Sequence, residues 1–262
     1  MKKNLMISAL IILIMIMNSC EKPQKKDDSF LKEDPAEINL SPEQIALKHN
    51  EALSYVLKEL STKDNFSDVN QMLFEARKTL INYYENQSDI LYPSDEYSYY
   101  STILENSFDK VDDKELSHFW FPENENQLTN YQMNVLDQLQ VILNDDNLSL
   151  SDKLSEFSII KEECNNSQTA TRVEKEVLII AIEVGMKSME YWHNHQDEWV
   201  ALVDNGSKWF DWGEVAGWDL AGAIGGAAGA AATGAGIGAG AVGGAIGTSV
   251  ANGVYQVWDH YM

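Results

Sequence analysis

The sequence predicts an all-α protein, with a bundle of about six helices followed by a glycine-zipper helical hairpin. Two observations lead to this fold class. Through most of residues 41–205, apolar residues recur at spacings of three and four, which is the helical period, and strand-like alternation is scarce. Residues 220–258 contain no Asp, Glu, Lys or Arg and consist mostly of Gly and Ala. We therefore expect an acidic helical domain over residues 41–205 and the hairpin over residues 206–262.

The amino terminus has the features of an exported lipoprotein. Two lysines precede an apolar run that is too short to span a membrane well, and Asn18-Ser19-Cys20 follows it. This tripeptide resembles a bacterial lipobox, and the resemblance implies that Cys20 is lipidated after cleavage of the chain before it. Residues 1–19 are then a signal peptide, and residues 20–40 are the lipidated cysteine and a flexible tether. A plain secretory signal with an incidental cysteine is the alternative.

The residue after the cysteine bears on localisation. Inner-membrane retention signals usually carry Asp at that position, where this chain has Glu21. The resemblance to lipoprotein signals therefore implies an anchor in the outer membrane of a bacterium. The run Lys25-Lys26-Asp27-Asp28 resembles the surface-export signals of some lipoproteins, which implies display at the cell surface.

Six helices are expected in the acidic domain. Ser41, Pro42 and Gln44 supply an N-cap, a first-turn proline and a capping-box partner for the first helix. The later helices are expected around residues 69–84, after Pro93-Ser94, around residues 128–142, after Ser149 or Ser151, and from near Thr171 to Trp192. Six helices of this length are enough to enclose one hydrophobic core.

The tail is expected to pack through its glycines, because their spacing of three and four puts them on one face of each helix. Such faces let two backbones approach closely, and they also allow self-association between copies. The expected packing residues are Gly222, Gly225, Gly226, Gly229, Gly236, Gly240, Gly243, Gly244 and Gly247, with Ala228 on the outer face. Glycines in the helix interiors oppose helix formation by roughly 10 kcal/mol in total, so the tail needs packing or lipid.

The length of the tail indicates a hairpin. One straight helix would run about 58 Å, against a hydrocarbon core of about 30 Å, and a break is available at Thr233-Gly234-Ala235-Gly236. Asp211, with Glu214 three residues later, is the expected N-cap. The flanking aromatic residues suit one membrane interface, and they are Trp209, Phe210, Trp212, Trp218, Tyr255 and Trp258. Burial of the hairpin in a soluble bundle and a disordered tail remain as alternatives.

Composition excludes some classes of function. A formal net charge of −22 makes nucleic acid an improbable partner. No nucleophile elbow, zinc-protease or phosphate-loop motif is present, and His193 and His195 would diverge on a helix. His49 and Cys164 each lie on an apolar helix face, which is typical of a core histidine that donates a hydrogen bond and of a buried thiol. We expect no enzyme activity, no metal and no cofactor.

Three short motifs carry a resemblance. They are His49-Asn50, Ser188-x-x-Tyr191-Trp192 and Asp219-x-x-Gly222-Ala223-x-Gly225. In order and spacing, over about residues 41–250, they resemble a set of uncharacterised bacterial lipoproteins and secreted proteins. The resemblance implies a helical domain with a glycine-zipper tail and transfers no activity. The tail by itself resembles glycine-zipper segments of bacteriocins and pore-forming proteins.

Three functions stay open at this point. The first is a lipid-anchored envelope protein with a structural or membrane-interacting role through the hairpin. The second is a contact-dependent antibacterial toxin whose hairpin inserts into a neighbouring membrane. The third is a soluble helical binding module with the hairpin as its core. The membrane is the expected partner, through the lipid anchor and, in the first two functions, through the tail, and the sequence indicates no particular protein partner.

Overall fold

The computed structural model describes residues 40–63, 66–91, 128–203, 211–233 and 237–259. The chain divides into two units, Met1–Pro35 and Ala36–Met262, and all of the described residues belong to the second. Several expected features lie outside them, namely the signal peptide, Cys20, most of the tether, the helix after Pro93-Ser94, Trp209, Phe210 and Gly236.

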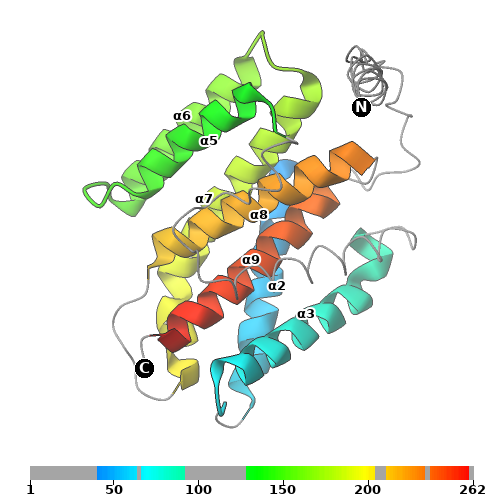
Figure 1. Ribbon diagram of the computed structural model, residues 1–262, viewed down its shortest axis with the longest axis vertical. Helices are drawn as coiled ribbons and strands as arrows, with labels where there is room; N and C mark the ends of the chain where they lie inside the picture. The colour runs from blue at the N-terminus through cyan, green and yellow to red at the C-terminus, as the bar shows by residue number, and fades with distance from the viewer. Residues whose placement is uncertain (1–39, 64–65, 92–127, 204–210, 234–236, 260–262) are drawn as a thin grey trace, which may run out of the picture. The chain divides into compact units, whose positions relative to one another are not determined.

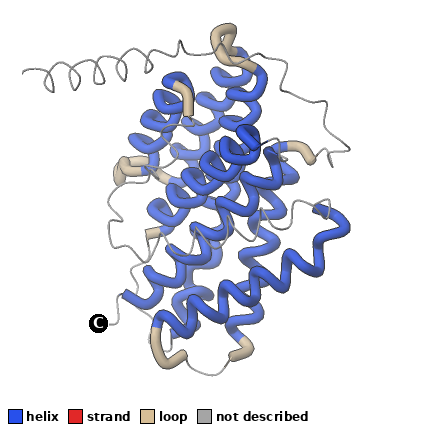
Figure 2. Tube along the Cα trace, turned by 45° about the vertical axis from the view of Figure 1, so that its right-hand side comes forward, coloured by secondary structure: helices blue, strands red, loops and turns tan. Residues whose placement is uncertain are grey.

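The described residues are mostly helical, with short loops and no strand, which confirms the all-α class (Figure 2). In chain order the helices are α2 (Pro42–Ser61), α3 (Val69–Leu91), α5 (Asn130–Leu143), α6 (Leu150–Asn166), α7 (Arg172–Val200), the short 3-10 helix η2 (Ala201–Val203), α8 (Trp212–Thr233) and α9 (Ile237–Asp259). Five of the helices expected in the acidic domain are thereby confirmed, and α8 and α9 flank the expected break.

Capping boxes begin four helices of the acidic domain, α2, α5, α6 and α7. The Ser41 Oγ accepts a hydrogen bond from the Gln44 backbone N–H (3.2 Å), and the Gln44 Oε1 accepts one from the Ser41 N–H (2.8 Å). The same reciprocal arrangement occurs at Thr129, Ser149 and Thr171, which begin α5, α6 and α7. Each box satisfies two backbone donors that a helix start leaves without partners, so the chain enters these helices at defined residues.

The helices α8 and α9, called the α8–α9 pair below, lie among the other helices (Figure 1). Helix α9 contacts α2, α3, α7 and α8, and every residue from 240 to 254 is buried. Helix α8 contacts α5, α7 and α9, and residues 215–224 are all buried. The buried parts of the charge-free stretch, residues 220–224 and 240–254, therefore belong to the hydrophobic core. Within the described ranges, no helix combines the length and the apolar character that crossing a membrane requires.

Four glycines set the distance between α8 and α9. A Cβ atom added to Gly226 would overlap the backbone carbonyl of Gly240, and one added to Gly240 would overlap that of Gly226. Gly222 and Gly244 stand in the same reciprocal relation. Residue numbers fall along one helix as they rise along the other, so the pair is antiparallel, and its backbones touch where only glycine fits.

The remaining predicted packing residues are placed differently. Gly225 and Gly229 are half-buried on α8, whereas Gly243 and Gly247 are buried on α9. Ala228, expected on the outer face of the hairpin, is only 7% exposed, so that face is not open to solvent at this residue. The α8–α9 pair is covered by other helices on more than one side. The glycine spacing within the pair does not predict these neighbours.

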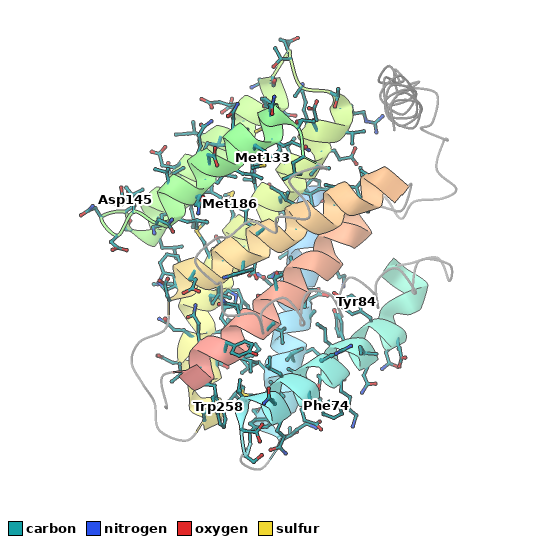
Figure 3. All side chains as sticks on the ribbon, in the orientation of Figure 1. Phe74, Tyr84, Met133, Asp145, Met186 and Trp258 are labelled. Carbon is teal, nitrogen blue, oxygen red and sulfur yellow. The ribbon has the colours of Figure 1, made fainter. Side chains whose placement is uncertain are left out.

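The aromatic residues at the ends of the pair pack against protein in this conformation. Trp218 is buried, and Trp212, Tyr255 and Trp258 are half-buried against the hydrophobic core (Figure 3 labels Trp258). The buried Lys153 on α6 lies 5.5 Å from the ring centroid of Trp212, and its Nζ donates to a backbone carbonyl at the end of α5 at 2.5 Å. A cation at a helix C-terminus is favourable, and this one joins α5, α6 and the start of α8.

We predict that Gly226→Ala lowers the free energy of unfolding by about 2 to 4 kcal/mol, because the added methyl group must push the Gly240 backbone away. Gly225→Ala is the matched control. Its position is half-buried, so the higher helix propensity of Ala should raise stability by about 0.5 to 1 kcal/mol. Urea unfolding followed by circular dichroism measures both, and equal effects at the two positions would contradict the close approach.

Candidate functional site

The three motifs of the sequence meet in one buried place. His49 comes from α2, Ser188 and Trp192 come from α7, and Asp219 comes from α8; each of the four is 0% exposed. With Asn50 of α2 and Ser249 of α9 they form a set of hydrogen-bonded side chains that we call the polar cluster. Because these residues are far apart in the chain, the cluster exists only when four helices are packed together (Figure 1).

The carboxyl group of Asp219 is the centre of the polar cluster. Its Oδ2 accepts hydrogen bonds from the Ser188 hydroxyl group and from the Trp192 Nε1–H, the latter at 3.2 Å. The same indole N–H lies 3.1 Å from the Ser249 Oγ, so α7 contacts α8 and α9 through one donor. The His49 Nε2 is 3.5 Å from Oδ2. Oδ1 has no hydrogen-bond partner among the described residues.

Asn50 orients the imidazole ring of His49. The Asn50 Nδ2 donates to the backbone carbonyl of Lys187 at 2.9 Å, which turns its Oδ1 toward the His49 Nδ1, also at 2.9 Å. A carbonyl oxygen can only accept, so Nδ1 carries the hydrogen in this arrangement. In the neutral ring, Nε2 is then a bare acceptor, and it faces Asp219.

Burial sets the charge state of both groups. It raises the pKa of Asp219 to about 7, against the opposing effect of hydrogen bonds from Ser188, Ser249 and Trp192. Burial also lowers the pKa of His49 to about 4, against the opposing hydrogen bond of Asn50. Between these two values neither group is charged. Both shifts favour a carboxylic acid beside a neutral imidazole over an ion pair at this 3.5 Å contact.

A row of polar side chains continues along the α8–α9 pair. The Thr248 hydroxyl group lies 2.9 Å from the backbone carbonyl of Trp218, and the Asn252 Nδ2 lies 3.5 Å from a carboxylate oxygen of Glu214. The Gln256 Oε1 accepts from the Asp211 N–H at 3.0 Å. These three α9 residues recur every four positions, so the last turns of α9 each contribute one polar contact to α8 or to its N-cap.

The N-cap predicted for the hairpin is present at the start of α8. Asp211 Oδ1 accepts a hydrogen bond from the Glu214 backbone N–H at 2.9 Å, as expected of an N-cap. Burial raises the pKa of the Glu214 carboxyl group, and the hydrogen bond from Asn252 opposes this shift. The entry to α8 is thus held by its own cap and by side chains of α9.

No known family model matches the chain, and no curated protein or solved structure is detectably similar to it. The polar cluster is therefore interpreted from its own geometry.

The polar cluster is packed inside the core, and around Asp219 it is closed to solvent. All of the side chains around Asp219 are buried, and a cavity of about 260 Å³ between α5 and α6 shares no residue with the cluster. The cavity borders Cys164, a buried residue whose thiol pKa is raised by burial. Among the described residues, no three His, Cys, Asp or Glu side chains lie together as metal ligands would. The arrangement can hold helices together, and it can hold a proton.

The sequence identified part of this site. His49 was predicted to be a core histidine that donates a hydrogen bond, and its burial and its contact with Asn50 confirm this. Cys164 is buried, as predicted. His193 packs edge-on against Trp212 while His195 pairs with Glu198, so these two histidines do have separate partners. The role of Ser249 was missed, because a serine in a Gly/Ala-rich stretch carries no signal of its own.

We predict that Asp219→Asn changes the free energy of unfolding by less than about 1 kcal/mol near pH 4, where the carboxyl group is already close to half protonated in the unfolded chain, because an amide has the shape and charge of the protonated acid and still accepts from Ser188 and Trp192. Asp219→Ala should cost about 3 kcal/mol or more, because it leaves a cavity and two buried donors without an acceptor. Denaturant unfolding measures both variants. A cost for Asn as large as that for Ala would mean that a negative charge is required.

Proposed function

We propose that this protein is a lipid-anchored, non-catalytic protein of the bacterial cell envelope, in which a glycine-zipper hairpin formed by the α8–α9 pair is the structural centre of an acidic helical domain. The observation that carries the proposal is the reciprocal backbone approach of Gly222 to Gly244 and of Gly226 to Gly240 inside a shell of other helices.

The packing accounts for the unusual composition of the tail. Glycine in a helix interior costs about 1 kcal/mol relative to alanine, so a glycine-rich helix is retained only where close packing offsets that cost. In the α8–α9 pair the offset comes from backbone contact, from burial among α2, α3 and α7, and from the polar row of Thr248, Asn252 and Gln256. A structural role for the hairpin is thus supported without any contribution from lipid.

A non-catalytic role is supported by the nature of the polar cluster. Its histidine, serine and aspartate are the residue types of hydrolytic sites, but all of them are fully buried, and the carboxyl group stands between the other two. A nucleophile needs a base that accepts its proton and room for a substrate, whereas the Ser188 hydroxyl group donates to a carboxyl group in a closed core. We therefore propose that the cluster fixes how the α8–α9 pair docks on α2 and α7.

The envelope location is supported by the amino-terminal sequence. The lipobox resemblance at Cys20 and the Glu21 that follows it favour an outer-membrane anchor or a cell-surface location. A strongly acidic chain suits this location, since the formal net charge of −22 becomes −24 once the signal peptide is removed with Lys2 and Lys3, and like charge keeps anchored copies apart from one another.

A pore-forming toxin is the second candidate, and the lengths of α8 and α9 favour it. They contain 22 and 23 residues, which corresponds to about 33 Å each and is close to the thickness of a hydrocarbon core. Release of a dye from lipid vesicles by the purified chain at neutral or acidic pH would favour this function over the structural one. Vesicles that stay intact under both conditions would remove it.

We predict that ending the chain after Val203 abolishes cooperative unfolding of the remaining helices, because α2, α3 and α7 would each lose their contacts with α9. Circular dichroism and tryptophan fluorescence during urea unfolding measure this. The full chain with Gly225→Ala serves as the control, since it changes the tail without removing it. If the truncated chain unfolds as sharply as the full one, the pair is a separable element and the structural proposal is wrong.

We also predict that the chain expressed in a bacterium incorporates labelled fatty acid and sediments with the membrane fraction. Cys20→Ser should lose both properties, because the sulfur atom is the expected site of lipid attachment. A variant that still takes up the label would place the lipid elsewhere, and a wild-type chain that takes up none would contradict the anchor.

A further inference from the structure

The fixed ring of His49 limits the protonation states that Asp219 can adopt. With the hydrogen on Nδ1 held by Asn50, the Nε2 lone pair of a neutral ring faces Asp219 Oδ2 at 3.5 Å. A carboxylate in that place would put two electron-rich atoms together with no hydrogen between them. The contact is favourable only when one proton is present, either on the carboxyl group or on Nε2.

The surroundings decide between these two states. Around Asp219, α7 presents Ser188 and Trp192, and α9 presents Ser249. The hydroxyl group of Tyr191 on α7 accepts from the Trp199 indole N–H instead. The nearby charged side chains form their own ion pairs, Lys48 with Glu51 on α2 and Lys187 with Glu190 on α7. The only charged residue of α9 is Asp259, at its far end. An ion pair at this place would lose its hydration with no further charge to compensate, so the neutral state is favoured.

We propose that Asp219 and His49 share one proton as a neutral pair, which latches the α8–α9 pair onto α2 with no net uptake or release of protons. In the unfolded chain near pH 5 the carboxyl group is ionised and the imidazole ring is protonated. On folding, the N–H bond at Nε2 of His49 is lost and an O–H bond forms on Asp219. The total number of bound protons is one in both states.

The two pKa shifts act on stability in opposite directions. The pKa of Asp219 is raised from 3.8 to about 7, so its contribution is fully present below pH 3.8 and is lost as the pH rises toward 7. The pKa of His49 is lowered from 6.5 to about 4, so its contribution is fully present above pH 6.5 and is lost as the pH falls toward 4. Between pH 4 and 6.5 the two slopes cancel.

The neutral pair of Asp219 and His49 adds a docking mechanism to the proposed function, and its biological meaning rests on that function. An envelope protein experiences the pH outside the cell. A docking contact that exchanges no proton keeps the hairpin in place when that pH falls, whereas a single buried histidine or a single buried carboxyl group would make docking depend on pH.

The protonation of His49 can be observed directly. In the purified chain labelled with ¹⁵N-histidine, the His49 ring should show the neutral form with its hydrogen on Nδ1 at pH 5, and His49→Gln assigns the signal by its loss. A doubly protonated ring at pH 5 would overturn the neutral pair. This result does not depend on lipid attachment, so failure of the latch and failure of the proposed anchoring are distinguishable.

Single substitutions test whether folding takes place without net uptake or release of protons. In His49→Gln the isolated carboxyl group should make the unfolding equilibrium constant rise by up to about tenfold per pH unit, relative to wild type, between pH 4 and 6.5. In Asp219→Asn the isolated histidine should make the same constant fall by up to about tenfold per unit over the same range. The double variant should run parallel to wild type.

Other outcomes of the pH-dependent unfolding measurements would contradict the proposal. Single variants whose stability curves both run parallel to wild type would show that the two groups do not exchange a proton on folding, and the proposal would fall. If His49→Gln does not fold, the ¹⁵N spectrum of the wild-type chain alone decides, with the free amino acid at the same pH as its reference.

Discussion

Contact between the backbones of α8 and α9 is the constraint on which the remaining structure depends. Gly222, Gly226, Gly240 and Gly244 bring the two helices closer than any side chain allows, and a narrow antiparallel pair is what α2, α3 and α7 can enclose. A wider pair would move α9 outward from its buried position. The high cost of glycine within a helix is thereby offset by tertiary packing, and α8 and α9 depend on the other helices for their existence.

The polar cluster adds specificity to this packing. Small-residue faces are smooth, so glycine contacts alone allow one helix to slide or rotate against the other. The hydrogen bonds from Ser188 and Trp192 to Asp219 are made in one position of α8, and the bond between Trp192 and Ser249 positions α9 at the same time. A buried carboxyl group costs stability in its charged form, and burial keeps Asp219 neutral up to about pH 7, against the opposing effect of the hydrogen bonds that it accepts.

Together these features favour a domain whose interior holds its tail and whose acidic surface faces solvent. The tail has the composition of a membrane-active segment, yet its buried faces are used for packing, and its polar residues bond within the pair or to α7. Composition and role are therefore separable: small residues permit close approach in lipid and in protein cores alike, and the neighbours of the helix decide which one occurs.

The sequence by itself determined the helices, because their signals are local. Ser41 with Gln44 and Thr171 with Glu174 cap within four residues, and the apolar spacing that buries His49, Leu53 and Val56 is contained in one helix. Only the tertiary structure decided what the tail packs against and that His49, Ser188, Trp192 and Asp219 meet. Those contacts join residues on separate helices, and a pattern within one helix shows which face is buried but not which partner buries it.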